Sequence, residues 1–448
     1  SSFTLDTIAP STPVAPTVIA NISSGISASE ATSGFSVTTS LVGTNAVAGD
    51  TIKLVINGGT TNLSATLSAS DITNGTYTFT VTNSSITANT NNTFAAQVID
   101  AAGNAGPASS TISLAYDTIA PAVTAVTDNT AASVTNAPIT FNVVFGEAVV
   151  GSVTTANFTA TNGTVSSVTT VDSTHYTVVV TPSSNVASGT VALSLVGTGL
   201  TDLAGNAIAN ASLSGLDAQS IDTLAPSTTV STVAFSADTG SSTTDFITKT
   251  AAQTISGTLS AVTVTGEVVK VSIDNGATWQ TATNTIGTNS FTLSGVTLTS
   301  SNTLQVRVED AVGNAGVAKT QAYVLDTTAP TVTVSLVGGA DNTVSSQTGD
   351  ANVVGAAEAN STVTIKTGAT TLGTASTDAS GNFVYTLTAG NITTLGQGND
   401  SITITQTDTA GNIGTSNTFT FRVDTIAPSA PVFALGTGVA GGATATEA

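Results

Sequence analysis

The sequence predicts an all-β fold, with four tandem antiparallel β-sandwich domains in a linear array. A motif that repeats at domain-sized intervals is the first observation behind this prediction. Asp-Thr-x-Ala-Pro begins at residues 6, 117, 222, 326 and 424, so successive copies lie 98 to 111 residues apart. Intervals of this size correspond to whole domains rather than to short structural repeats.

A second motif, Asp-x-x-Gly-Asn, begins at residues 100, 202, 310 and 408 and precedes the next Asp-Thr-x-Ala-Pro by 16 to 20 residues. That spacing leaves room for a turn and one strand. Because the two motifs keep the same phase four times, they delimit four similar units. The predicted domains are 11–117, 118–222, 223–326 and 327–424. Residues 1–10 are expected to end a preceding repeat and its linker, and residues 425–448 to start a following repeat.

The composition favours strands and turns over helices. Thr, Ser, Val, Ala, Asn and Gly dominate the chain, whereas the helix-favouring residues Glu, Lys, Arg, Met and Gln are scarce. Hydrophobic residues make up 40% of the chain, which is too many for a disordered linker. Helices are therefore expected to be rare.

Segments that alternate apolar and polar residues predict the individual strands. Beyond a strand after Pro16, these segments are 35–41, 51–56, 76–81, 94–99 and 110–116 in the first domain; 139–145, 176–180 and 191–195 in the second; 268–273 in the third; and 362–365, 383–387 and 401–405 in the fourth. Six or seven short strands in about 110 residues are typical of an antiparallel sandwich.

The charge balance excludes several classes of partner. The chain has 7 Lys and Arg against 27 Asp and Glu, a net charge of −20. A nucleic-acid binder or a protein that binds an anionic membrane surface needs a basic surface, which this chain lacks. No apolar run approaches membrane-spanning length, so direct membrane insertion is not expected. With no Cys, disulfides and thiolate metal sites are excluded.

Nothing in the sequence predicts an enzyme. His175 is the only His, and it is expected to begin a strand and face solvent. A Ser-His-Asp triad would be the only familiar catalytic set available, and no Gly-x-Ser-x-Gly segment accompanies it. The chain also has no phosphate-binding loop.

The wording of the repeats resembles the bacterial immunoglobulin-like (Ig-like) repeats of giant secreted surface adhesins, the RTX-type and biofilm-associated proteins. Beside the two motifs, Val-Gly-Ala-Ala-Glu at 354–358 and Ile-Asp-Asn-Gly-Ala-Thr-Trp at 273–279 are similar to that family. The resemblance covers essentially the whole chain. It implies a non-catalytic extender region at the bacterial cell surface, acting in cell adhesion and biofilms, with calcium stiffening its linkers. Expected partners are neighbouring repeats of the same long chain and other copies in a surface assembly.

Acidic residues from three places are expected to meet at one end of each domain. In an Ig-like sandwich, the first strand begins at the end that carries the turn before the last strand and the turn between the second and third strands. Asp117 should therefore lie near Asp202 of the domain that it enters, and not near Asp100. The turn between the second and third strands adds one more Asp or Glu in every domain.

Each such end would collect a linker Asp, a turn Asp or Glu, and the Asp and Asn of the second motif. The four sets are Asp6, Asp50, Asp100 and Asn104; Asp117, Glu147, Asp202 and Asn206; Asp222, Glu267, Asp310 and Asn314; and Asp326, Glu358, Asp408 and Asn412. Three facing carboxylates repel by several kcal/mol, and a divalent cation reverses that sign. Ca²⁺ suits the sets because it takes about six to eight oxygens in flexible geometry. Mg²⁺ demands a stricter octahedron, and Zn²⁺ favours nitrogen or sulfur.

Alternatives remain open at this stage. The motif Asp residues also suit ordinary turns, where the side chain caps nearby N–H groups. Six further acids are candidates for additional sites at the other end of a domain, but a solvated loop is favoured for each: Glu30, Asp71, Asp238, Asp245, Asp341 and Asp350. The runner-up function is a subunit of a surface layer or extracellular filament that assembles end to end. The third is a carbohydrate-binding module, which would need exposed aromatic residues; Trp279 and the Phe residues are expected in the core instead.

Overall fold

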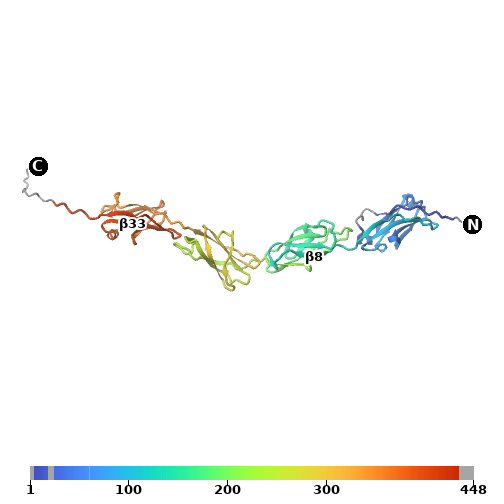
Figure 1. Ribbon diagram of the computed structural model, residues 1–448, viewed down its shortest axis with the longest axis horizontal. Coiled ribbons are helices and arrows are strands. Elements are labelled where there is room, and N and C mark those ends of the chain that lie inside the picture. The colour runs from blue at the N-terminus through green and yellow to red at the C-terminus, as the bar shows by residue number, and fades with distance from the viewer. Residues whose placement is uncertain (1–4, 19–24, 60, 133, 433–448) are drawn as a thin grey trace, which may run out of the picture. The chain divides into compact units, whose positions relative to one another are not determined.

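A computed structural model describes residues 5–18, 25–59, 61–132 and 134–432 of the 448-residue chain. Strands make up nearly all of the regular structure, as the ribbon shows, with β8 (Val123–Asp128) in the second domain and β33 (Gly398–Thr407) in the fourth (Figure 1). Residues 1–4 of the segment expected to end a preceding repeat, and residues 433–448 of the expected following repeat, lie outside the described residues.

The first domain is a sandwich of two sheets. One sheet has the order β1-β2-β5 and the other β4-β3-β6-β7. The strands are β1 Thr17–Val18, β2 Phe35–Ser40, β3 Thr51–Ile56, β4 Thr61–Thr66, β5 Thr76–Val81, β6 Thr90–Ile99 and β7 Ile112–Tyr116, with short helices α1 Ala28–Ser33 and α2 Ala69–Asn74 and 3-10 turns η1 Asn57–Gly59 and η2 Asn83–Ser85. In β2, the alternation of the sequence appears as alternating burial, with Phe35 and Val37 facing the core.

The second domain has a four-stranded sheet, β12-β13-β10-β8, faced by two smaller sheets, β11-β15-β16 and β14-β17-β9. Its strands besides β8 are β9 Val134–Thr135, β10 Ile139–Phe145, β11 Phe158–Ala160, β12 Gly163–Thr170, β13 His175–Pro182, β14 Gly189–Val191, β15 Leu193–Leu195, β16 Ala211–Ser212 and β17 Gln219–Ile221, and the 3-10 turn η3 covers Thr155–Asn157. His175 begins β13 and is exposed, as predicted. The predicted strand 191–195 is divided between β14 and β15.

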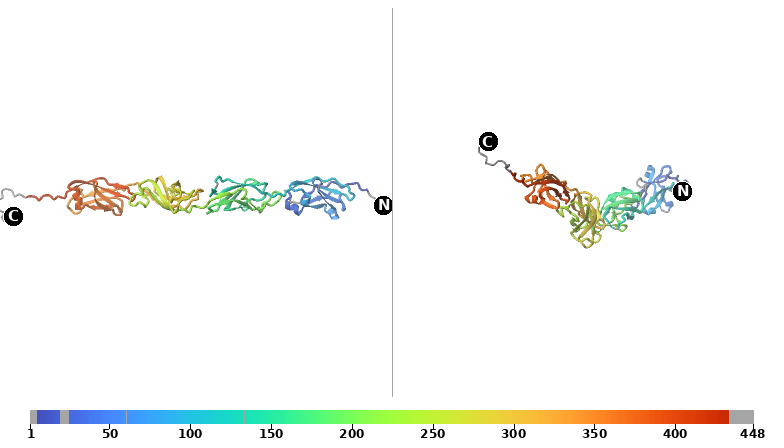
Figure 2. Two further views of the ribbon diagram at one scale, coloured as in Figure 1. Left: turned by 90° about the horizontal axis from the view of Figure 1, so that it is seen from below. Right: turned by 60° about the vertical axis from the view of Figure 1, so that its left-hand side comes forward.

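The third and fourth domains repeat this plan. The third has sheets β18-β20-β24-β23 and β19-β26-β25-β21-β22, and the fourth has β27-β29-β32 and β28-β35-β33-β30-β31, where β34 also pairs with β33. The bounds are β18 Val230–Phe235, β19 Ile247–Thr248, β20 Ala252–Leu259, β21 Val268–Ser272, β22 Gln280–Thr281, β23 Thr283–Asn284, β24 Ser290–Thr297, β25 Asn302–Glu309 and β26 Lys319–Leu325; then β27 Thr333–Val337, β28 Thr343–Val344, β29 Asn352–Ala356, β30 Thr362–Thr367, β31 Thr370–Ser376, β32 Asn382–Thr386, α3 Ala389–Leu395, β34 Ile413–Thr415 and β35 Phe419–Val423. Figure 2 shows the strand-rich domains from two other sides.

Each domain starts with two short segments that pair with different sheets. The first segment pairs antiparallel with the next long strand, as β8 does with β10. The second segment pairs parallel with the last strand, as in β9–β17, β19–β26, β28–β35 and the Ile26–Tyr116 bridge. One short parallel pair per domain is therefore added to the antiparallel sandwich that the sequence predicts. This crossing closes the sandwich and places the start of each domain beside the turn before its last strand.

Each of the four domains has its own hydrophobic core among the described residues, and each core lies inside one predicted domain range. One fully buried Phe belongs to each core: Phe94, Phe141, Phe291 and Phe383. In the first domain Phe94 meets Phe35 of the opposite sheet edge to face, with ring centroids 6.1 Å apart. Such pairs add about 0.5–1.5 kcal/mol to the burial of apolar area.

The expectation that Trp279 is a core residue is wrong. Trp279 is half-buried and lies outside the third core, and the Cζ of Arg307 sits 3.9 Å from the centre of its ring. Arg307 also forms an ion pair of 2.6 Å with Glu309. The Arg side chain therefore covers one face of the indole and shields it from solvent, by a cation–π contact that needs no deeper burial.

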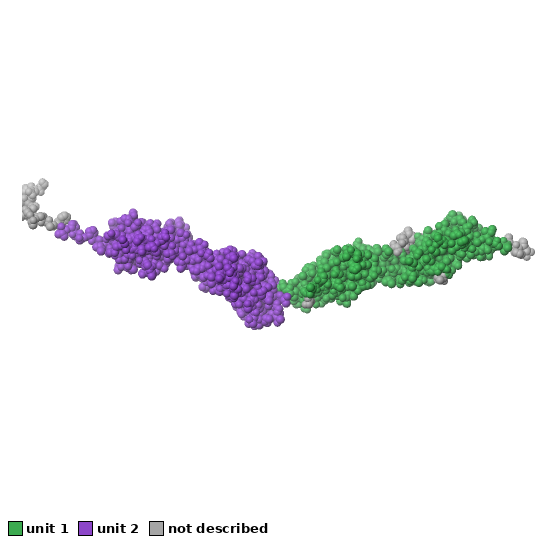
Figure 3. All heavy atoms as spheres, viewed as in Figure 1, with its two compact units in different colours: residues 1–225, 312–314 green, residues 226–311, 315–448 purple. Residues whose placement is uncertain are grey.

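The chain separates into two compact units, shown in Figure 3. The first unit contains residues 1–225 and 312–314, and the second contains residues 226–311 and 315–448. The first two domains thus belong to one unit and nearly all of the last two to the other.

Candidate metal centre

The Asp-x-x-Gly-Asn motif folds into a turn that is capped by its own side chains. In Asp202–Asn206, one carboxylate oxygen of the Asp accepts the backbone N–H of the Asn at 2.8 Å and the other accepts its side-chain Nδ2–H at 2.6 Å. The corresponding distances are 2.7 and 2.7 Å for Asp100–Asn104 and 2.7 and 2.8 Å for Asp408–Asn412. The Gly has φ near +90° in all four copies, a conformation that a side chain disfavours. The Asn104 side chain holds the pKa of Asp100 below its ordinary value.

The same Asn attaches the turn to the linker. Its Nδ2 donates to the backbone carbonyl of the linker Asp in all four domains: Asn104 to Asp6 at 3.0 Å, Asn206 to Asp117 at 3.0 Å, Asn314 to Asp222 at 3.0 Å, and Asn412 to Asp326 at 2.8 Å. The carboxylate of each linker Asp accepts the backbone N–H two residues on, for example Ile119 to Asp117 at 2.9 Å. We call this end of a domain, where the chain enters, the proximal end, and the opposite end the distal end.

At the proximal end of the second domain, three carboxylates converge. Oxygens of Asp117, Glu147 and Asp202 all lie within 4.8 Å of one another, and this is the only such group of three acids among the residues that the structure describes. Asp202 is buried, with 3% of its surface exposed, and the other two are half-buried. The grouping of Asp117 with Asp202 follows the placement that the sequence suggests.

Glu147 differs from its two neighbours in having no hydrogen bond to its carboxylate among the described residues. Burial raises its pKa first, and the negative charges of Asp117 and Asp202 raise it further. An unneutralised carboxylate that faces two others is the arrangement that a divalent cation stabilises. The ligand roles of the three acids stay a prediction.

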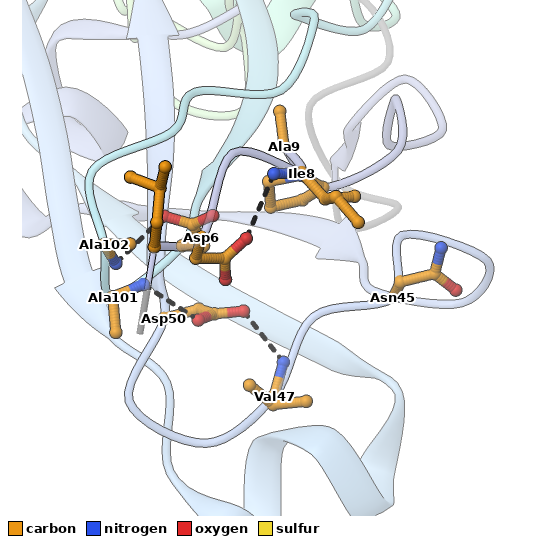
Figure 4. Close-up of a pocket in the computed structure, with 11 residues that line it drawn as sticks. Asp6, Ile8, Ala9, Asn45, Val47, Asp50, Ala101 and Ala102 are labelled. Atoms are coloured by element: carbon orange, nitrogen blue, oxygen red, sulfur yellow. Dashed lines mark hydrogen bonds between the residues drawn. The ribbon is translucent and has the colours of Figure 1, made fainter. Parts of the chain in front are cut away.

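At the proximal end of the first domain, Asp6, Asp50 and Asp100 line one open pocket of about 760 Å³. Figure 4 shows Asp6 and Asp50 facing each other across it. Asp50 is buried, and its oxygens accept the backbone N–H groups of Val47 at 2.9 Å and Ala101 at 3.2 Å. The first set is therefore assembled around one space, but its ligand atoms are spread more widely than those of the second set.

The other two sets are arranged differently. In the fourth domain, Glu358 accepts a hydrogen bond from Gln406 Nε2 at 2.8 Å, which occupies one carboxylate oxygen. In the third, Glu267 accepts the backbone N–H of Val264 at 3.1 Å. Asp222 and Asn314 belong to the first compact unit, whereas Glu267 and Asp310 belong to the second.

The structure also shows a role that the sequence does not suggest for the motif Asn. Asn206 Oδ1 accepts the backbone N–H of Ala28, the first residue of α1 at the distal end of the first domain, at 2.9 Å. Asn314 Oδ1 accepts a hydrogen bond from Asn136 Nδ2 at 3.0 Å, again within the first unit. The donor at Ala28 is a backbone group, so no side-chain pattern could indicate it; the free N–H groups of a helix start are the only signal.

Two acids that were expected in solvated loops instead cap helices. Glu30 and Asp71 are the third residues of α1 and α2, and each accepts the backbone N–H of the N-cap Ser, Ser27 or Ser68. This reciprocal capping satisfies N–H groups that a helix start leaves free. The Ser68 side chain lowers the pKa of Asp71. In both acids the cap bonds go to one carboxylate oxygen.

No described helix has the length and apolar character to span a bilayer. Residues 117–218 and residues 224–327 each match a family model described as a bacterial Ig-like domain. No curated protein matches the sequence.

Three solved structures illustrate what the chain is similar to. The first is a tetra-tandem repeat in the extending region of a large adhesion protein, with 21% identity, a TM-score of 0.33, and coverage of 93% of this chain and 100% of that chain. The second, from work on a 1.5-MDa bacterial ice-binding adhesin, has 17% identity, a TM-score of 0.26 and coverage of 92% and 98%. The third is the BSP domain of a biofilm associated protein, with 13% identity, a TM-score of 0.17 and coverage of 95% and 99%.

Proposed function

The chain carries tandem bacterial Ig-like domains, and from that premise we propose that it is a non-catalytic extender segment of a large bacterial surface adhesin, with calcium at its joints. A joint here means a linker with the two domain ends that adjoin it. In this role the segment holds another part of the protein away from the cell surface and contributes to adhesion and biofilm formation. The chain has four separate hydrophobic cores, one after another along the sequence. Its charged residues are mostly acids. Both features suit a spacer better than a binding or catalytic domain.

The observation that carries the calcium proposal is the group Asp117, Glu147 and Asp202. Asp117 belongs to the linker, while Glu147 and Asp202 belong to the body of the second domain. A cation bound by all three would tie the linker to the domain that it enters, and so reduce bending there. Asn206 donates a hydrogen bond to the backbone carbonyl of Asp117, and this bond holds the linker against the second domain without any ion.

Calcium is the cation that these groups favour. All candidate ligands are oxygens, and the carboxylates come from three separated segments, which suits a large ion with flexible coordination. Only about half of the ligands that Ca²⁺ takes need come from the carboxylates, because backbone carbonyls and water can supply the others. At a free Ca²⁺ concentration about one hundred times the dissociation constant of the site, binding would stabilise the second domain by about 2.7 kcal/mol.

Isothermal titration calorimetry of the full chain with Ca²⁺ tests the proposal. We expect binding that is lost from one site in Glu147→Gln and retained in Asp172→Asn, a charge-matched control in an exposed turn of the same domain. Small-angle scattering with and without chelator then reports bending. Zero bound calcium in millimolar Ca²⁺, or an unchanged scattering profile after chelation, would refute the calcium part of the proposal.

A further inference from the structure

A direct contact joins the third and fourth domains, both in the second compact unit. Thr239, at the distal end of the third domain, donates from Oγ1 to the carbonyl of Ala410 at 2.6 Å. Lys249 donates from Nζ to the carbonyl of Gly411 at 2.5 Å. Ala410 and Gly411 lie inside the Asp408–Asn412 turn, so the partner of this contact is the motif turn of the next domain.

The backbones at this joint touch. A Cβ at Gly240 would lie 1.9 Å from the carbonyl oxygen of Thr409, which leaves no room for any side chain. A Cβ at Gly411 would lie 3.0 Å from the backbone nitrogen of Gly240. The two glycines therefore allow main chain to pack against main chain, the close approach for which glycine is needed.

Burial of the turn supports the same contact. Ala410 is fully buried, with none of its surface exposed. Ala102 holds the equivalent place in the first motif turn and is exposed. The sequences of the two turns are nearly alike, so the difference comes from the distal end of the third domain, which covers the fourth-domain turn.

The donors are held in place by the third domain itself. The Thr239 hydroxyl accepts the backbone N–H of Lys249 at 2.9 Å and lies 3.2 Å from Thr248 Oγ1. Thr248 is the end of β19 and is buried. The loop that carries Thr239 and the residue that directly follows β19, Lys249, thus form one surface that presents two donors to two successive carbonyls.

The electrostatics of this joint differ from those of the joint between the first two domains. There, three acids converge and the distal end of the first domain offers a neutral backbone N–H from Ala28. At the joint between the third and fourth domains, Glu358 is engaged by Gln406 and the distal end offers a lysine ammonium. We propose that Lys249, with the Gly240–Gly411 contact, holds the third and fourth domains together by direct contacts that persist even when no metal is bound at their joint. This proposal rests on the contacts just described and does not require calcium at the other joint.

Spin-label distance measurements on the full chain test it, since a chain without cysteine accepts label pairs at chosen sites. One pair, at exposed Ser290 and Thr420, spans the third and fourth domains; a second, at exposed Ser64 and Thr169, spans the first and second. In chelator we expect a single narrow distance distribution for the Ser290–Thr420 pair. Lys249→Met and Gly240→Ala should each remove that narrow peak.

Two matched controls separate the lock from general damage to the third domain. Lys270→Met removes another lysine, whose Nζ bonds to Thr281 of the same domain and to no other described residue. Gly287→Ala places a side chain at another positive-φ glycine, with nothing within 4 Å. Both should keep the narrow peak. A broad Ser290–Thr420 distribution for the parent chain in chelator, or a peak that survives Lys249→Met, would overturn the lock. If the distance distribution of the Ser64–Thr169 pair does not change when chelator is added, the result would contradict the calcium proposal and leave the contact between the third and fourth domains untouched.

Discussion

Asn206 Nδ2 lies 3.0 Å from the backbone oxygen of Asp117, and this hydrogen bond joins residues 89 positions apart. The same amide group also bonds Asp202 and accepts the N–H of Ala28 in the preceding domain. One buried side chain therefore connects a turn, a linker and a neighbouring domain. The equivalent bond from Asn to the linker carbonyl occurs in all four domains, so it is a feature of the repeat and not of one joint.

Asn206→Ala should destabilise the second domain. The substitution leaves the Asp117 carbonyl, the Asp202 carboxylate and the Ala28 N–H without this partner, and each buried polar group left unpaired costs about 1–3 kcal/mol. Hydrogen exchange read by mass spectrometry should show faster exchange at the motif turn and at the start of α1. Asn142→Ala, at an exposed position of β10, is the control and should leave exchange at both places unchanged.

Much of this arrangement could be predicted from the sequence. Alternating patterns located strands such as β2, β3, β5 and β10 to within a residue. The phase of the two motifs placed Asp117 near Asp202, because strand order fixes which turns share an end of a sandwich.

What the sequence could not indicate depends on local competition for hydrogen bonds. The sequence around Glu358 does not show that Gln406 would donate a hydrogen bond to its carboxylate. Nor does the sequence around Glu147 show that this carboxylate would accept none from the part of the chain that the structure describes. The sequence predicts Trp279 in the core, whereas in the structure Arg307 of β25 covers one face of its ring. The predictions that were wrong or could not be made concern side chains whose contacts come from other strands and turns, because the pattern along one strand does not indicate such contacts.

Glu147→Gln should change the stability of the second domain with opposite signs in the two metal states. In chelator the substitution removes repulsion among three carboxylates, so the melting temperature of this domain should rise. In millimolar Ca²⁺ it removes a ligand, so the melting temperature should fall relative to the parent chain. Differential scanning calorimetry of both chains in both buffers measures these melting temperatures. A change of the same sign in both buffers would show that Glu147 does not bind the ion.

The raised pKa of Glu147 also predicts a pH dependence in chelator. Burial and the charges of Asp117 and Asp202 make the folded domain hold the Glu147 proton more tightly than the unfolded chain does. The folded state therefore binds more protons between the two pKa values, and stability falls as pH rises through that interval. On acidification from about pH 7 towards about pH 4.5, near the ordinary Glu value, the parent chain should gain stability relative to Glu147→Gln. A constant difference between the two melting curves across this range would contradict the prediction.

Gly355→Ala should destabilise the fourth domain through its core. A Cβ at Gly355 would lie 2.1 Å from the carbonyl oxygen of Thr333 and 2.6 Å from the ring of Phe383, which is fully buried. Neither the strand backbone nor the enclosed ring can move away freely, and overpacking of this kind costs about 1–3 kcal/mol.

Gly390→Ala is the matched control, because its Cβ would meet nothing closer than Thr388 Oγ1 at 3.7 Å. Gly390 lies within α3, where Ala is favoured over Gly by about 1 kcal/mol, so this control should stabilise the same domain. Denaturant unfolding that placed both variants on the same side of the parent chain would show that the Phe383 ring does not confine position 355.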